Sequence, residues 1–171
     1  GRPARRRILV LLAHPSIGRS AVIGPLARTA ASVDGVTLVD LYAHYPDLHV
    51  DAALEQERLR AHDVLVFLHP LYWYSTPAIL KQWQDLVLEH GFAYGHEGTA
   101  LAGKIFLSAV SAGGPDHAYR AGGDNRFTLS ELLRPLEQMA ALCGMRYLPP
   151  FALYGARAAA TSGRLDAHLA R

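Results

Sequence analysis

The sequence predicts an α/β protein in which five short parallel strands form a doubly wound sheet with helices on both faces. Length is the first indication, because 171 residues suffice for one domain and are too few for two. Alternation is the second, because short apolar runs are separated by segments of helical periodicity. Neither a repeat nor a linker interrupts this order, which is typical of parallel strands crossed by helices.

The first expected strand, from Ile8 to Ala13, has the continuous hydrophobicity of a strand that is buried on both faces. The other strands are expected at residues 36–41, 64–68, 105–110 and 145–153. Helices are expected at residues 20–32, 51–60 and 129–142, from Pro77 onward, and in the tail after Thr161. Ser20 and Asp51 are N-capping residue types, and proline is favoured in the first turn of a helix.

Five strands in a chain of this length favour the flavodoxin-like topology over the dinucleotide-binding type, which is the competing arrangement. We expect a basic, loosely ordered N-terminus at residues 1–7 and a single domain at residues 8–171. In both topologies a ligand binds beyond the carboxyl ends of the strands, where the strand order reverses. The loops after the first, third and fourth strands are therefore the candidate site.

Composition excludes several classes of function. The net charge is only +2, and no stripe of Lys and Arg with interleaved aromatics follows the basic start, so nucleic acid is not an expected partner. None of the nine histidines forms an HxxxH or HExxH pair, so no metal site is expected. Cys143 is the single cysteine and the first apolar run is too short to span a membrane, so we expect a cytoplasmic protein.

The loop after the first strand, from His14 to Ser20, leads into a helix whose N-terminus can attract phosphate through free N–H groups and its dipole. Ser16 and Ser20 add hydroxyl groups, and Arg19 can pair with a phosphate. A capped helix start with an incidental histidine explains the same residues. No GxGxxG or GxxxxGK[ST] motif is present to decide between the two.

The segment HPLYWYSTPAILKQW, residues 69–83, follows the third strand. Its consecutive aromatics Tyr72, Trp73 and Tyr74 cannot all point into the core, so some face a ligand or a partner. A planar heteroaromatic ring is the natural guest of such a loop. An aromatic cluster that caps the sheet edge or forms a subunit contact is the alternative.

The loop after the fourth strand begins with Ser111, Ala112, Gly113 and Gly114. Paired glycines can turn successive N–H groups toward one point and form an anion-binding concavity. Against a flavin, this concavity would stabilise the negative charge that gathers on reduction. A flexible glycine loop is the alternative, but all three loops lie at one edge of the sheet, which favours a ligand site.

These motifs resemble those of the flavin-dependent NAD(P)H:quinone reductases of the DT-diaphorase type, in particular the bacterial ancillary oxidoreductases of glutathione-gated potassium-efflux systems. The resemblance covers nearly the whole chain and rests on HPLYWYSTPAILKQW, GFAYG (residues 91–95) and SAGG (residues 111–114), in this order and spacing. It implies FMN rather than FAD as cofactor, NADH or NADPH as hydride donor, a quinone-like acceptor and a homodimer.

The resemblance also implies roles for individual residues. It places His14 and Ser20 at the FMN phosphate, and Tyr119 as the tyrosine that assists hydride transfer by hydrogen bonding to the flavin. The flavin ring would be held by two groups of residues, namely Pro70, Leu71, Tyr72, Trp73 and Tyr74, and Ser111, Ala112, Gly113 and Gly114. Family sites lie at a dimer interface, to which the second chain would contribute the segment with Phe92, Tyr94 and His96.

Several positions depart from the family pattern. Tyr72 stands in place of a glutamine, Ile23 in place of an asparagine that helps to hold the phosphate, and Ala112 in place of a threonine. Asn125 stands where the animal enzymes have the histidine that partners the active-site tyrosine. His117 and His96 are candidates to replace that histidine, and the candidate catalytic residues are Tyr119, His117 and Asn125.

The expected reaction is ping-pong: NAD(P)H reduces the flavin and departs before the quinone binds and takes two electrons. The alternative from another class is a regulatory subunit of a membrane potassium-efflux protein, with redox turnover as a secondary property. A one-electron carrier is disfavoured by the basic pI of 8.8 and by the aromatic slot. A reductase that acts on a quinone or enone of a biosynthetic pathway is a further alternative.

Overall fold

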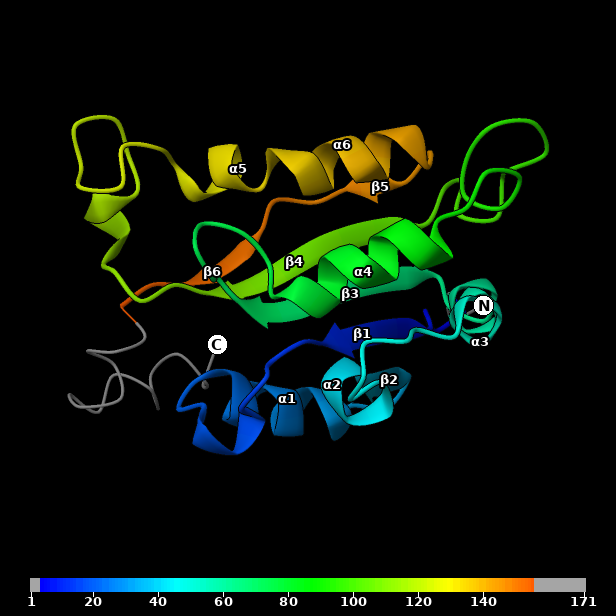
Figure 1. Cartoon of the computed structure of the whole chain (residues 1–171), viewed down its shortest axis with the longest axis horizontal. Coiled ribbons are helices and arrows are strands. Elements are labelled where there is room, and N and C mark those ends of the chain that lie inside the picture. Colours follow the sequence, from blue (N-terminus) through cyan, green and yellow to red (C-terminus); the bar gives the residue numbers. More distant parts are fainter. Residues whose placement is uncertain (1–3, 156–171) are drawn as a thin grey trace.

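The computed structural model describes residues 4–155 of the chain and contains one parallel sheet (Figure 1). The strand order is β2-β1-β3-β4, and both β5 and β6 then pair with β4. The strands are β1 (Ile8–Leu12), β2 (Val36–Asp40), β3 (Val64–Pro70), β4 (Ile105–Ser111), β5 (Arg146–Tyr147) and β6 (Phe151–Leu153). This order, with its reversal between β1 and β3, is the flavodoxin-like one and confirms the predicted fold class.

Helices connect the strands and cover both faces of the sheet. They are α1 (Ile23–Ala31), α2 (Leu41–His44), α3 (Ala52–Arg60), α4 (Ala78–Val87), α5 (Leu129–Leu132) and α6 (Arg134–Leu142), with the 3₁₀ turns η1 (Ile17–Arg19) and η2 (Asp116–Ala118). On one face α1 packs on Val10 and Leu12 of β1 through Ile23 and Ala27. The opposite face is covered by α3, α4, α5 and α6.

Aromatic packing fixes α4 on the sheet. Phe67 of β3 meets the Trp83 ring edge to face at a centroid distance of 5.6 Å, and meets Phe106 of β4 in the same manner at 4.8 Å. All three side chains have exposed fractions of 0%. Because α4 follows directly after the loop of residues 71–77, this packing fixes the position of the end of that loop relative to the sheet.

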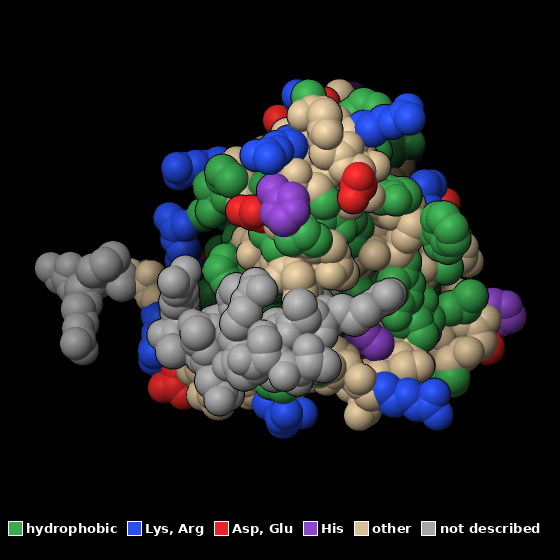
Figure 2. Space-filling model, turned by 90° about the vertical axis from the view of Figure 1, so that its left-hand side faces the viewer, with side chains coloured by type: hydrophobic (Ala, Val, Ile, Leu, Met, Phe, Trp, Pro, Cys, Tyr) green, Lys and Arg blue, Asp and Glu red, His purple; other side chains and the backbone are tan. Residues whose placement is uncertain are grey.

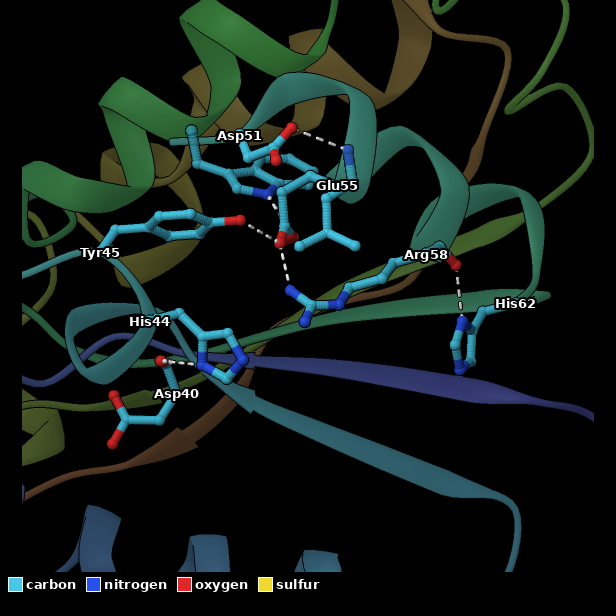
Figure 3. Close-up of polar contacts among 9 residues, drawn as sticks. Asp40, His44, Tyr45, Asp51, Glu55, Arg58 and His62 are labelled. Atoms are coloured by element: carbon cyan, nitrogen blue, oxygen red, sulfur yellow. Dashed lines mark hydrogen bonds and ion pairs between the residues drawn. The ribbon is translucent and has the colours of Figure 1, made fainter. Parts of the chain in front are cut away.

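A buried carboxylate holds α2, α3 and α4 together (Figure 3). Glu55 of α3 accepts hydrogen bonds from the Tyr45 hydroxyl at 2.9 Å and from Trp83 Nε1 at 3.2 Å, and it pairs with Arg58. Burial and the bond to Glu55 raise the pKa of Tyr45 to about 12. In Figure 3, Asp51 lies at the start of α3, where it caps the helix by accepting from the Leu54 N–H at 3.1 Å.

Two expected elements are interrupted, and proline explains both interruptions. The strand expected at residues 145–153 is divided into β5 and β6, because Pro149 and Pro150 have no N–H to donate to the β4 ladder. The helix expected at residues 129–142 is divided into α5 and α6 at Leu133, because Pro135 cannot continue a helix but suits the first turn of a new one.

The remaining expectations differ in detail. α1 begins at Ile23, three residues later than expected, and Ser20 caps it from outside. The single turn of α2 is not predicted, although Asp40 caps it in the ordinary way. The helix expected after Thr161 lies outside the described residues.

The basic start of the chain is tied to the sheet where the structure describes it. The Arg7 N–H donates to Asp63 at 2.9 Å, and Arg5 pairs with Asp34 at 3.3 Å. Within residues 4–155, no helix combines the length and the apolar character that crossing a membrane requires.

Candidate functional site

A cavity of about 400 Å³ lies at the carboxyl ends of β3 and β4. Two loops line it: Leu71, Trp73 and Tyr74 come from the loop after β3, and Gly113, Gly114, Tyr119 and Asn125 from the loop after β4. All seven are among the residues that the sequence predicts for the site. Figure 2 looks onto this end of the molecule and shows separate patches of hydrophobic side chains with acidic and His side chains between them, and Lys and Arg side chains mostly toward the margin.

The first wall of the cavity is an aromatic turn, residues 72–75. Tyr72 and Ser75 exchange both backbone hydrogen bonds, at 2.9 and 3.0 Å. The two residues between them, Trp73 and Tyr74, have φ angles of 46° and 64°. A two-residue turn with both φ positive is normally made by Asn-Gly, so a Trp-Tyr pair holds a strained backbone here. Trp73 lines the cavity and its side chain is 93% exposed.

The second wall is a glycine loop that is anchored on both sides. Ser111 accepts from the Leu71 N–H at 2.8 Å, and the Ala112 N–H donates to Leu153 of β6 at 2.9 Å. Ser111 and Ala112 are buried, and neither of them lines the cavity. A Cβ added to Gly114 would lie 3.4 Å from the Tyr119 ring, which shows how closely this backbone approaches the tyrosine.

Tyr119 and Asn125 form the floor between these walls. Tyr119 is 8% exposed and packs against Tyr154 at a ring distance of 5.5 Å. Asn125 accepts a hydrogen bond from the Tyr74 hydroxyl at 3.1 Å, which leaves its Nδ2 amide as a donor. The sequence prediction did not include Tyr154, although its position just after β6, at the carboxyl edge, could have indicated it.

The loop after β1 meets the aromatic turn through His14, whose ring lies 6.1 Å from the Tyr72 ring in an edge contact. His14 Nδ1 accepts from the Ser16 N–H at 3.0 Å, so the neutral ring carries its proton on Nε2 and can donate. Burial lowers the pKa of His14, against the raising effect of Asp40. The histidine is therefore a neutral donor at the start of this loop.

Ser20 closes the same loop. Its Oγ accepts from the N–H groups of Ile23 at 2.9 Å and Gly24 at 3.3 Å, so its own O–H stays available to a ligand. Arg19 is exposed on η1. Ile23 is 1% exposed and lies in the α1-side core, so it offers nothing polar to a phosphate.

Not all predicted residues lie at this cavity. His117 is exposed on η2 and does not line it. Phe92 is 6% exposed in the chain's own core, beneath the guanidinium of Arg60 at 4.8 Å, while Tyr94 is half-buried and His96 exposed. In Figure 1 the segment of residues 91–103 lies at the opposite end of the sheet from the loops that form the cavity. One chain therefore does not bring this segment to the site.

The chemistry of the cavity suits a flat, polar-edged aromatic ring. Its volume lies within the roughly 300–1,000 Å³ of small-molecule sites, its aromatic walls offer stacking surfaces, and its glycine loop allows close approach of the backbone. Among residues 4–155 no three His, Cys, Asp or Glu side chains gather in a way that could hold a metal ion.

Known proteins resemble this chain over nearly its full length. The model of a family described by its flavodoxin-like fold (Flavodoxin_2) matches residues 6–171. The glutathione-regulated potassium-efflux system ancillary protein KefG of Serratia proteamaculans is 50% identical over 151 residues, which is 88% of this chain and 82% of that protein.

Two solved structures are similar in both fold and sequence. General stress protein 14 of Treponema denticola, in complex with FMN, has a TM-score of 0.86 and 39% identity, and the match covers 96% of this chain and 98% of that one. An NADPH-quinone reductase from P. pentosaceus has a TM-score of 0.83 and 34% identity, with 95% of each chain covered.

Proposed function

The chain belongs to the family of flavodoxin-like fold whose model matches residues 6–171, and we propose that it is an FMN-dependent NAD(P)H oxidoreductase that reduces quinones or related electrophilic acceptors. The observation that carries this proposal is the cavity between the aromatic turn and the glycine loop. The FMN bound to the Treponema protein and the quinone reductase named among the solved structures support it.

Within the cavity, each wall would hold a different part of FMN. The aromatic side chains of Trp73 and Tyr74 would lie against the flavin ring, and the backbone N–H groups of Gly113 and Gly114 would face its pyrimidine edge. His14 Nε2–H and the Ser20 hydroxyl would bind the phosphate, while the N–H groups of Ile23 and Gly24 at the start of α1 already donate to Ser20 Oγ. When bound, FMN supplies the hydride chemistry, and the chain supplies orientation and electrostatics.

Tyr119 is the candidate proton donor or hydrogen-bond relay. Its hydroxyl lies near the glycine loop, 3.6 Å from where a Gly114 Cβ would stand. Asn125 cannot release a proton, so it would orient a substrate oxygen through Nδ2–H while the Tyr74 hydroxyl holds its carbonyl oxygen. The histidine function of the animal enzymes would thus be divided between an orienting amide and the Tyr119 phenol.

The proposal includes a ping-pong order of substrate binding. One planar ring would stack over the flavin beside Trp73, so nicotinamide and quinone would occupy the same surface in turn. The segment of residues 91–103, which contains Phe92, Tyr94 and His96, lies at the opposite end of its own sheet (Figure 1), so a second chain would have to bring it to this surface. We therefore include in the proposal a homodimer with the site at its interface.

Visible spectroscopy of the dialysed protein tests the proposal directly. Flavin bands should bleach on anaerobic addition of NADH or NADPH and return on addition of a quinone. Initial rates at several concentrations of both substrates should give parallel double-reciprocal lines, whereas intersecting lines would contradict the ping-pong order. Failure to bind flavin after incubation with excess FMN would refute the proposed function as a whole.

A second candidate function is supported by the 50% identity to the potassium-efflux ancillary protein of Serratia. In this role the chain would bind a membrane potassium-efflux protein and regulate it, with redox turnover as a secondary property. Flavin that binds but is not reduced by either nicotinamide, together with co-purification of an efflux protein, would favour regulation. Rapid turnover with no effect on potassium efflux would favour the reductase alone.

A further inference from the structure

Two buried side chains of the sheet each carry one polar atom without a protein partner. His69, near the end of β3, and Ser108 of β4 both have exposed fractions of 0%. Among residues 4–155, His69 Nε2 and Ser108 Oγ are the only buried side-chain nitrogen or oxygen atoms that no protein group meets at hydrogen-bonding distance. Buried polar atoms almost always have a partner, either in the protein or in an ordered water.

The hydrogen bond that His69 does form fixes its tautomer. Nδ1 lies 2.9 Å from the carbonyl oxygen of Pro70. A carbonyl oxygen can only accept, so Nδ1 donates, and Nε2 of the neutral ring is left as an acceptor. Burial lowers the pKa of His69 to about 4, so the ring is neutral near pH 7. Nε2 therefore requires a donor.

Strand register places the two unpartnered atoms on the same face of neighbouring strands. Phe67 pairs with Ser108, and His69 pairs with Val110. Side chains alternate along a strand, and Phe67 and Val110 both belong to the core on the α4 side. His69 and Ser108 thus point to this side as diagonal neighbours on adjacent strands, and no direct hydrogen bond joins them.

We propose that one buried water lies between His69 and Ser108, donates to His69 Nε2 and forms a second hydrogen bond with the Ser108 hydroxyl. Water suits the pair because it both donates and accepts, and buried waters typically satisfy groups that the protein leaves unpaired. A metal ion does not suit it, since the pair offers only one ring nitrogen and one hydroxyl and no carboxylate or thiolate.

Through this water His69 is a positioning residue for the cavity. The imidazole holds the carbonyl of Pro70, where β3 ends. The next residue, Leu71, donates to Ser111 and lines the cavity. A ring fixed at both nitrogens therefore sets the direction in which the chain leaves β3 toward the aromatic turn. This role does not depend on which ligand the cavity binds.

An atomic-resolution crystal structure of the full chain is the first test. We expect one ordered water within hydrogen-bonding distance of both His69 Nε2 and Ser108 Oγ. A direct bond between the two side chains, or a site without a water, would overturn the proposal.

Nitrogen-15 NMR of the histidine ring gives a readout that a change in stability alone would not move. In the wild type, Nδ1 should be protonated and Nε2 should resonate as a hydrogen-bonded acceptor. Ser108→Ala should shift Nε2 toward the position of a free acceptor, and Ser108→Thr should restore it. Ser130→Ala removes an exposed hydroxyl on α5 and serves as the control. An unchanged Nε2 resonance in Ser108→Ala would refute the bridge, whatever the stability of the variant.

Discussion

Replacing the strained pair at the aromatic turn should make the protein more stable and its cofactor site weaker. The turn closes between Tyr72 and Ser75, with Trp73 and Tyr74 both at positive φ. Asn-Gly is the pair that adopts this conformation without strain. The double variant Trp73→Asn/Tyr74→Gly therefore keeps the turn and removes its aromatic side chains.

The expected gain in stability is the sum of three contributions to the free energy of unfolding. A left-handed residue costs roughly 1–2 kcal/mol, so relieving two gives about 2–4 kcal/mol. Trp73 is 93% exposed, so its removal loses little burial. Tyr74 is 46% exposed, so its removal loses part of its burial as well as the hydrogen bond to Asn125, at a combined cost of about 1–2 kcal/mol. The free energy of unfolding of the FMN-free protein should rise by about 1–2 kcal/mol.

Urea unfolding of the FMN-free protein and fluorescence titration with FMN measure the two effects separately. FMN must be absent from the first assay, because a ligand that binds only the folded state adds its own stability. In the second assay the dissociation constant should rise about tenfold or more, since two aromatic contacts are lost. Phe127→Asn is the control: Phe127 is 52% exposed, but its φ is not positive, so this variant should not gain stability. A double variant less stable than the wild type would refute the strain.

Three further outcomes are expected. Tyr119→Phe should slow flavin reduction by NAD(P)H roughly ten- to hundredfold in stopped-flow measurements with FMN affinity unchanged, and an unchanged rate would exclude its role. Burial lowers the pKa of His69 from the ordinary 6.5 of an exposed histidine to about 4, so its contribution to stability is complete above pH 6.5 and falls as the pH drops toward 4. Between pH 7 and 4.5 the wild type should lose about 2 kcal/mol more than His69→Asn in urea unfolding, and equal losses would contradict this. Glu55→Gln should destabilise the protein by about 3 kcal/mol, because Arg58 loses its charged partner, whereas Glu57→Gln at an exposed pair should cost under about 1 kcal/mol.

The location of the cavity was predictable because it depends on topology. Alternating strands and helices imply a parallel sheet, and a parallel sheet gathers the loops after its strands at one edge. Leu71 and Gly113 are far apart in sequence, yet both line one cavity, because β3 and β4 are neighbours in the sheet. The aromatic residues of one loop and the glycines of the other then indicate that these two loops form the walls of the cavity.

The backbone of the aromatic turn was not predictable from its residues. Propensity rules assign positive φ to Gly, Asn or Asp, and they would place Trp73 and Tyr74 in an extended or helical conformation. The breaks at Leu133 and after Tyr147 were missed for a different reason: Pro135, Pro149 and Pro150 were included in continuous elements on the strength of hydrophobic pattern alone. Tertiary contacts determine the backbone conformation of the aromatic turn. The missing proline N–H determines where the two elements break.

The strain at Trp73 and Tyr74 persists because the elements on either side of the turn cannot yield. Upstream, the Leu71 N–H is bound to Ser111 and β3 is paired on both edges. Downstream, Trp83 anchors α4 through Phe67 and Glu55. A turn held between two rigid anchors keeps its backbone in place without a ligand, so a flavin that binds there loses little entropy in ordering that backbone. By the same reasoning, the Glu55→Gln substitution should loosen α4 and so weaken FMN binding, although Glu55 does not line the cavity. If this variant bound FMN as tightly as the wild type, the aromatic turn would hold its shape without the support of α4.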